Sequence, residues 1–167
     1  MLNLPIAVLF SLALINTSRP PTPYIDKGAC PFEGCIYREW IALKAIRLLD
    51  RPNGKRVVGM IHQGEHVIGL TGEVHCMPVL VHALEDVPDP QNLRHIVVRK
   101  GEAFYLLHRL GEGYWLGWYK GKLIDVDEFS NPGKVPQAVW WVKVKTPSGL
   151  AGWTISDGNF AGQDSLS

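Results

Sequence analysis

The segment 140–153 constrains the fold most strongly, because it reads as a strand, a tight turn and a second strand with tryptophan at both ends. Two valines alternate with two lysines over 142–145, which is the period-two pattern of a half-buried strand. Residues 146–149, Thr-Pro-Ser-Gly, are typical of a type I turn, since proline presets φ at its second position. Strand parity predicts that Trp140 lies in a core with the valines, and that Trp141 lies outside with the lysines.

The composition favours many short strands joined by turns, since the 167 residues include 17 glycines and 12 prolines. Residues 37–49 also fit the spacing of an amphipathic helix, but the turn and the β-branched run that follow favour a strand at 45–49. The further strands that we expect cover 57–61, 65–70, 74–82, 95–98, 103–110, 114–119 and 122–126. A net charge of +1 without any basic block argues against nucleic acid as a partner.

An apolar run at residues 4–15 is too short to span a bilayer comfortably and fits the hydrophobic region of a signal peptide. We therefore expect a signal peptide over 1–18, export to a periplasmic or extracellular compartment, and no membrane span once it is removed. A short uncleaved anchor is the alternative. The proline-rich segment 19–29 is predicted to be an extended linker.

The three cysteines are interpreted in that exported context. Cys30 and Cys35 enclose a short loop, and an oxidising compartment favours a disulfide between them in the segment 30–39. Zinc is the weaker interpretation, because the spacing is wider than the usual knuckle and a second pair is missing. Cys76 is left over, and its apolar surroundings predict a buried strand residue.

An internal repeat relates 63–73 to 100–112, since each has a Gly-Glu turn, an apolar strand and a second Gly-Glu pair. With the closing hairpin at 140–153, this pattern resembles the bacterial SH3-like (SH3b) domains, in particular uncharacterised exported proteins. The resemblance implies a mainly β chain with two small SH3-like barrels in tandem. They would occupy 40–84 and 93–157, joined by a linker at 85–92 and followed by a tail at 158–167.

Some SH3b domains bind peptidoglycan or its peptide stems, so the resemblance implies an exported, non-enzymatic binding or scaffold protein. Its partner would be a cell-wall glycopeptide or an envelope protein. Aromatic side chains concentrate in the second module, and amphipathic aromatics on a small barrel suit contact with sugars or peptides. The ligand-binding residues predicted from this concentration are Tyr105, Trp115, Trp118, Tyr119 and Trp141. Alternatively, exposed aromatics only cover barrel ends or pack between modules.

Two other functional classes remain open. A small secreted hydrolase could use Cys76 with a histidine, although His75 would point to the opposite face of the same strand. An envelope structural protein could associate through an edge strand of the first module. Six histidines are scattered without a ligand motif, so we predict neither a metal nor another cofactor.

Overall fold

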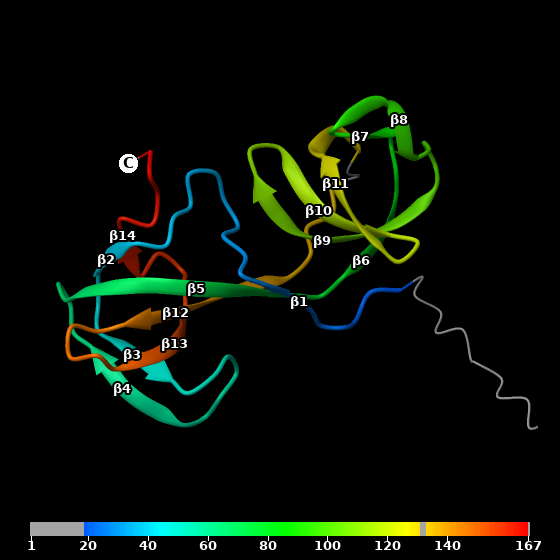
Figure 1. The fold of residues 1–167 in the computed structure, drawn as a ribbon. Coiled ribbons are helices and arrows are strands. Elements are labelled where there is room, and N and C mark those ends of the chain that lie inside the picture. Colours follow the sequence, from blue (N-terminus) through cyan, green and yellow to red (C-terminus); the bar gives the residue numbers. More distant parts are fainter. Residues whose placement is uncertain (1–18, 131–132, 167) are drawn as a thin grey trace, which may run out of the picture.

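The computed structural model describes residues 19–130 and 133–166, so the expected signal peptide lies outside the described residues. Strands are the dominant secondary structure of the described chain, which confirms the mainly β expectation, and its curled sheets form two lobes side by side (Figure 1). The first lobe contains β1 (Tyr24–Lys27), β2 (Glu39–Ala42), β3 (Ile46–Leu49), β4 (Val57–Ile61), β5 (His66–Cys76), β12 (Ala138–Lys145), β13 (Ala151–Ile155) and β14 (Phe160–Ala161). The second lobe contains β6 (Val79–His82), β7 (Val87–Asp89), β8 (Asn92–Val98), β9 (Ala103–Gly111), β10 (Tyr114–Tyr119), β11 (Lys122–Asp127) and the 3₁₀ turn η1 (Glu128–Ser130).

The first lobe is one curled sheet with the strand order β14-β2-β5-β12-β13-β3-β4, and β1 pairs with the far half of β5. Alternate residues of these strands face inward. They form a core whose buried members are Trp40, Ala42, Ile46, Leu48, Ile61, Val67, Val142, Val144 and Phe160. Residues 37–49 contribute two short strands, so the strand interpretation of 45–49 is confirmed.

The second lobe has a sheet ordered β11-β10-β9-β6 and a separate two-stranded ribbon, β7-β8. Its core is again built from inward-facing strand residues: Val81, Ala83, Val87, Val98, Phe104, Leu106, Trp115 and Val126. Parity holds along β10, where Trp115 is buried while its neighbour Tyr114 is exposed. The predicted hairpin turn at 119–122 joins β10 to β11.

The lobes are nested along the chain, which corrects the expected tandem boundaries. The closing hairpin, β12-β13, pairs with β5 and β3 of the first lobe, and not with the second module to which 93–157 assigned it. The second lobe is therefore an insertion between β5 and β12. The structure places three further elements where linkers or a tail were expected: β1 within 19–29, β7 within 85–92 and β14 within 158–167.

The internal repeat is visible as the same turn in both lobes. Glu65 accepts a hydrogen bond from the main-chain N–H of His62, and Glu102 accepts one from that of Arg99, each at 2.9 Å. The glycine before each glutamate has positive φ, which favours glycine. The strand pairs around these turns also correspond, since β2-β5 matches β6-β9 and β12-β13 matches β10-β11.

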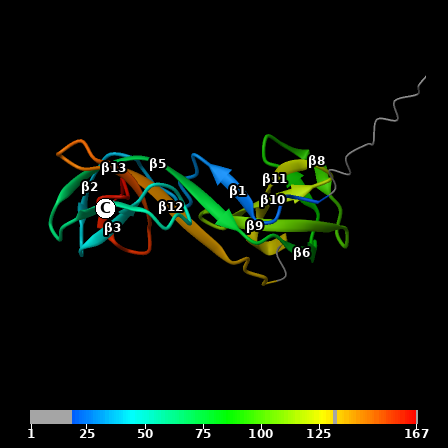
Figure 2. The same cartoon turned by 90° about the horizontal axis from the view of Figure 1, so that it is seen from below.

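A third apolar cluster joins the lobes, and its buried members are Val74, Cys76, Leu107 and Leu116. β1 lies beside β5 in this region, between the lobes (Figure 2). The predicted Cys30–Cys35 disulfide is formed, and its loop packs Phe32 edge-on against Trp140 with ring centroids 5.7 Å apart. The two lobes therefore share apolar contacts as well as chain connections.

The two adjacent tryptophans of β12 lie on opposite faces, as parity predicts, but neither has the expected exposure. Trp140 is half-buried and packs against the first core. Trp141 lies on the other face yet is only 6% exposed, so its expected exposure is wrong. The ring of His75 lies 6.4 Å from the Trp141 indole, and His75 is held by Asn53 and Glu73. The His75 ring therefore lies against Trp141 on this face of the strand.

Candidate functional site

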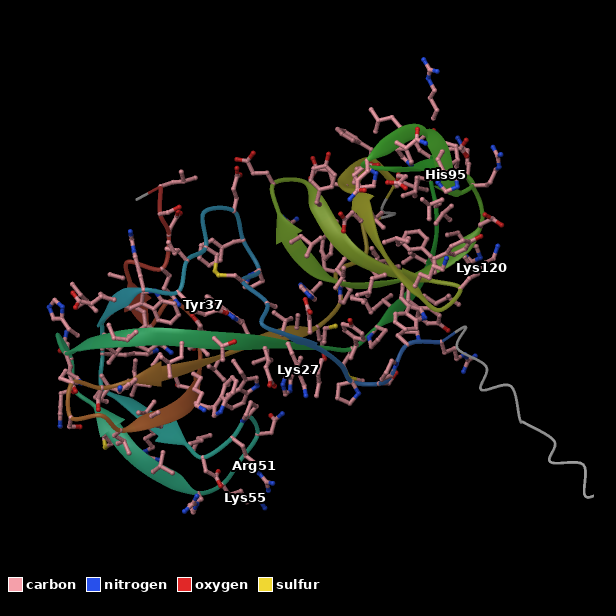
Figure 3. The ribbon with its side chains drawn as sticks, viewed as in Figure 1. Lys27, Tyr37, Arg51, Lys55, His95 and Lys120 are labelled. Carbon is pink, nitrogen blue, oxygen red and sulfur yellow. A yellow bond between two sulfur atoms is a disulfide. The ribbon has the colours of Figure 1, made fainter. Side chains whose placement is uncertain are left out.

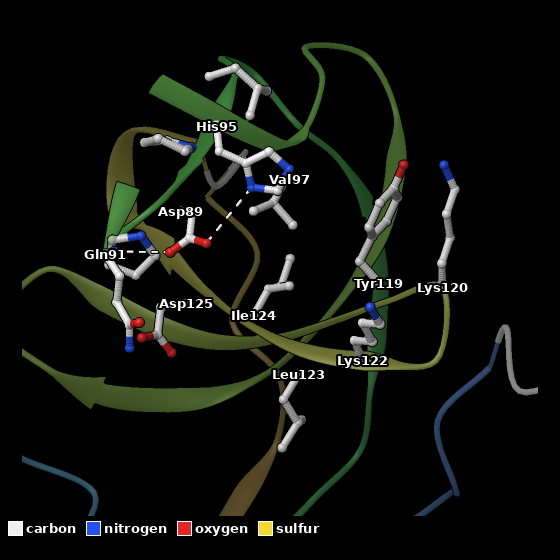
Figure 4. A pocket seen from close by; sticks show the side chains of 13 residues that line it. Asp89, Gln91, His95, Val97, Tyr119, Lys120, Lys122, Leu123, Ile124 and Asp125 are labelled. Carbon is white, nitrogen blue, oxygen red and sulfur yellow. Dashed lines mark hydrogen bonds and ion pairs between the residues drawn. The ribbon is translucent and has the colours of Figure 1, made fainter. Parts of the chain in front are cut away.

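An open cleft of about 540 Å³ lies in the second lobe between the β7-β8 ribbon and the β10-β11 hairpin (Figure 4). It is lined by residues 88–91, 95–97, 119–120 and 122–125. β7 lies within the proline-punctuated segment 85–92, and the β10-β11 hairpin closes through a two-residue turn. Two hairpins from different parts of the sequence thus form its walls.

One wall carries a connected group of polar side chains around Tyr119. The Tyr119 hydroxyl donates a 2.9 Å hydrogen bond to Glu102 Oε2, and the Lys120 ammonium lies 3.6 Å from Glu102 Oε1. Lys120 Nζ also lies 4.4 Å from the centroid of the Tyr119 ring. Hydrogen bonds from the Arg99 main chain and from Tyr119 hold the pKa of Glu102 below its usual range, and Tyr119 and Glu102 raise the pKa of Lys120.

The turn that carries Lys120 has an uncommon backbone. Lys120 has φ of 47° and Gly121 has φ of 87°, so both central residues occupy the left-handed region of a type I′ turn. Asparagine, aspartate and glycine are the usual residues at the first of these positions. Holding a lysine there costs on the order of 1 kcal/mol. The turn places a cationic side chain at the rim of the cleft.

The opposite end of the cleft is acidic. Asp89 Oδ2 lies 3.7 Å from His95 Nδ1, and Asp89 Oδ1 accepts a 2.9 Å hydrogen bond from the main-chain N–H of Gln91. Figure 4 shows Asp89 and Asp125 at this end and the two lysines, Lys120 and Lys122, at the other. Figure 3 shows that His95 and Lys120 belong to the second lobe, far from Arg51 and Lys55 in the first.

Apolar side chains form the floor between these two charged ends. Val97 and Ile124 both pack against the core of the second lobe and line the cleft. Such a site can bury an apolar group of a ligand at its centre. Its lysine end can pair with a negative group of that ligand, and its aspartate end with a positive group. The arrangement suits a short ligand that carries both charges.

The five aromatic residues predicted to bind ligand do not form one surface. Tyr119 alone lines the cleft. Trp115 is buried in the second core, under the guanidinium of Arg109, and Trp141 is buried in the first lobe. Tyr105 and Trp118 face each other across β9 and β10, where Trp118 packs in the cluster between the lobes beside Tyr24. The alternative, that aromatics pack between modules, therefore describes Trp118 better.

Sequence reasoning missed most of the cleft. The acidic and proline-rich composition of 85–92 predicts a linker, but this segment supplies Asp89 to the cleft. Lys120 and Lys122 flank a turn that was recognised, but a turn alone does not indicate what its side chains face. A lysine at a turn position that requires positive φ was the one available signal.

Cys76 has neither the exposure nor the charge state of a nucleophile. It is 1% exposed, and burial, with a smaller contribution from Asp26, raises the pKa of its thiol to about 12. The described residues contain no cluster of three or more histidine, cysteine or acidic side chains able to hold a metal. Within the same part of the chain, no helix has the length and apolar character needed to cross a membrane. Comparison with known proteins found no matching family model, curated protein or solved structure.

Proposed function

We propose that this chain is an exported, non-enzymatic binding protein built from two SH3-like barrels, and that it recognises a peptide-bearing component of the cell envelope. The cleft in the second lobe carries the proposal, because it combines an apolar floor with opposite charges at its two ends. The repeated Gly-Glu turns and matching strand pairs support two related barrels. The disulfide supports an oxidising compartment.

A retention assay tests this function. Protein purified without residues 1–18 is incubated with isolated cell wall and, separately, with envelope extract. Lys122→Glu reverses a charge at the cleft, and Lys145→Glu makes the same change on an exposed strand residue of the first lobe. We expect wild type and Lys145→Glu to be retained, and Lys122→Glu to bind about threefold to tenfold more weakly.

Absence of retention on both materials would overturn the proposed function. An equal loss of retention in the two variants would show that the cleft is not the binding site, because a general charge effect would then explain the result. A folding control is needed for each variant, and a urea midpoint equal to that of wild type supplies it.

Edge-strand association is the second candidate, and one observation favours it. β4 ends the sheet of the first lobe, and its Val57 and Met60 side chains are half exposed. Exposed apolar edge strands tend to pair with other chains. An apparent mass that rises with concentration in sedimentation, and that falls back in Met60→Lys, would support this alternative. The hydrolase is not proposed, because Cys76 is buried and protonated.

A further inference from the structure

The cleft runs along an edge of β11. Four consecutive residues of this strand, 122–125, line it. Successive strand side chains point to opposite faces, so a cleft over one face would touch only alternate residues. A cleft that touches all four must lie against the edge, where the main chain is accessible. Within the described residues, β11 pairs only with β10 and ends its sheet.

The turn fixes which main-chain groups of β11 point toward the cleft. A two-residue type I′ turn closes on a hydrogen-bonded pair, here Tyr119 with Lys122, and bonded and non-bonded pairs then alternate along the strands. Ile124 pairs with Gly117 in the bonded position. The N–H and C=O groups of Leu123 and Asp125 therefore point away from β10, toward the cleft.

In the first lobe, the strand edge that corresponds to the open edge of β11 is paired with another strand. β13 corresponds to β11, and its outer edge pairs with β3 through Trp153 and Leu49. In the second lobe the corresponding ribbon, β7-β8, forms its own separate sheet. Pro88 and Pro90 line the cleft on that side, and proline has no N–H to donate to a ladder. The second lobe thus keeps an open strand position that the first lobe has filled.

We propose that the cleft binds an extended peptide as an added strand, hydrogen-bonded to Leu123 and Asp125 and antiparallel to β11. This inference rests on the proposed function and specifies its ligand class. The direction follows from charge: the peptide's carboxylate lies by Lys122 and Lys120, and its ammonium lies by Asp125 and Asp89 (Figure 4).

The same geometry limits the length of the peptide. Lys122 and Asp125 are separated by three residue steps, which span about 10 Å in a strand. β7 lies close to β11, which limits the room beside this strand. A peptide of about three to four residues, with free termini, spans the distance between the two charged ends.

Nuclear magnetic resonance titration of the chain with an alanine tetrapeptide tests the proposal at millimolar concentrations. We expect the amide signals of Leu123 and Asp125 to shift more than that of Ile124, and hydrogen exchange at those two amides to slow. Tetrapeptides methylated at single backbone nitrogens give the sharper result. Methylation at alternate positions should weaken binding by about threefold to tenfold, and methylation at the position between them should not.

Terminal charges are tested separately. Amidating the peptide's C-terminus should weaken binding to wild type. Lys122→Gln should remove the difference in affinity between the acid and the amide, whereas Lys145→Gln should keep it.

Equal effects of methylation at every position, or unshifted Leu123 and Asp125 amides, would overturn strand addition. So would binding of an N-acetylglucosamine tetramer in the cleft in place of the peptide. If the protein is still retained on cell wall while one of these results is obtained, strand addition is wrong but the proposed function is kept. If retention is also absent, both the proposed function and strand addition are wrong.

Discussion

His108 and Asp26 join the two lobes through a direct contact, since His108 Nε2 lies 2.9 Å from Asp26 Oδ2. Asp26 belongs to β1 of the first lobe, and His108 belongs to β9 of the second and is 2% exposed. The other ring nitrogen, Nδ1, donates to the carbonyl oxygen of Arg109 at 2.7 Å. Both partners of this imidazole are hydrogen-bond acceptors, so the buried ring is held at both of its nitrogens.

Asp26→Asn should therefore loosen the junction between the lobes. The substitution keeps the size of the side chain but removes the charge that faces His108, and we expect the free energy of unfolding to fall by about 1–3 kcal/mol. Asp157→Asn is the matched control, because Asp157 forms an exposed ion pair with Lys44 and should lose less than about 1 kcal/mol. Urea unfolding of both variants measures this. Equal losses would show that the buried contact contributes no more than the surface pair.

Cys76 should be unreactive in the folded protein. Alkylation requires the thiolate, and burial keeps the thiol protonated because it raises its pKa to about 12. Iodoacetamide at neutral pH, or at pH about 9, should leave native Cys76 unmodified by mass spectrometry, and should modify it fully in urea. Rapid modification of the native protein would contradict the burial and reopen the hydrolase alternative.

The features that the sequence predicts correctly depend on neighbours in the chain. The turn at 119–122 follows from glycine and its flanking strands, and the burial of Trp115 beside exposed Tyr114 follows from strand parity. The Cys30–Cys35 bridge joins residues five positions apart. Each of these depends on local geometry, for which a single sequence carries enough information.

The features that were wrong depend on distant pairing. β12 pairs with β5 across the whole inserted lobe, and local patterns do not indicate which strands become neighbours. Trp141 is covered by His75, whose own position depends on Asn53 from a third segment. The cleft has the same origin, because its walls come from a supposed linker and a turn. A candidate site built from such contacts requires the three-dimensional structure.

Trp141→Ala should act on stability and not on ligand binding. Removing a buried indole leaves a cavity, so we expect a loss of about 3–5 kcal/mol in the free energy of unfolding. Tyr114→Ala, at an exposed aromatic of the second lobe, should lose less than about 1 kcal/mol. Urea unfolding separates the two. Where folded Trp141→Ala protein can be prepared, its peptide titration should match wild type. A selective loss of peptide binding would instead assign this residue to the site.

Glu102 should make the wall of the cleft sensitive to acid. Its pKa is lowered in the folded protein, chiefly by the hydrogen bond from the Arg99 main chain and then by that from Tyr119. The stabilisation is therefore present above the usual glutamate range and is lost as the pH falls through the lower, folded-state pKa. Glu102→Gln should be less stable than wild type near neutral pH, and the difference should shrink on acidification.

Glu65→Gln is the control from the repeat, because Glu65 accepts the same main-chain bond, from His62. Urea unfolding across the acidic range measures both, together with the Tyr119 ring signals. If the difference in the free energy of unfolding between wild type and Glu102→Gln stays constant with pH, the charge of the Glu102 carboxylate does not hold Tyr119 in place.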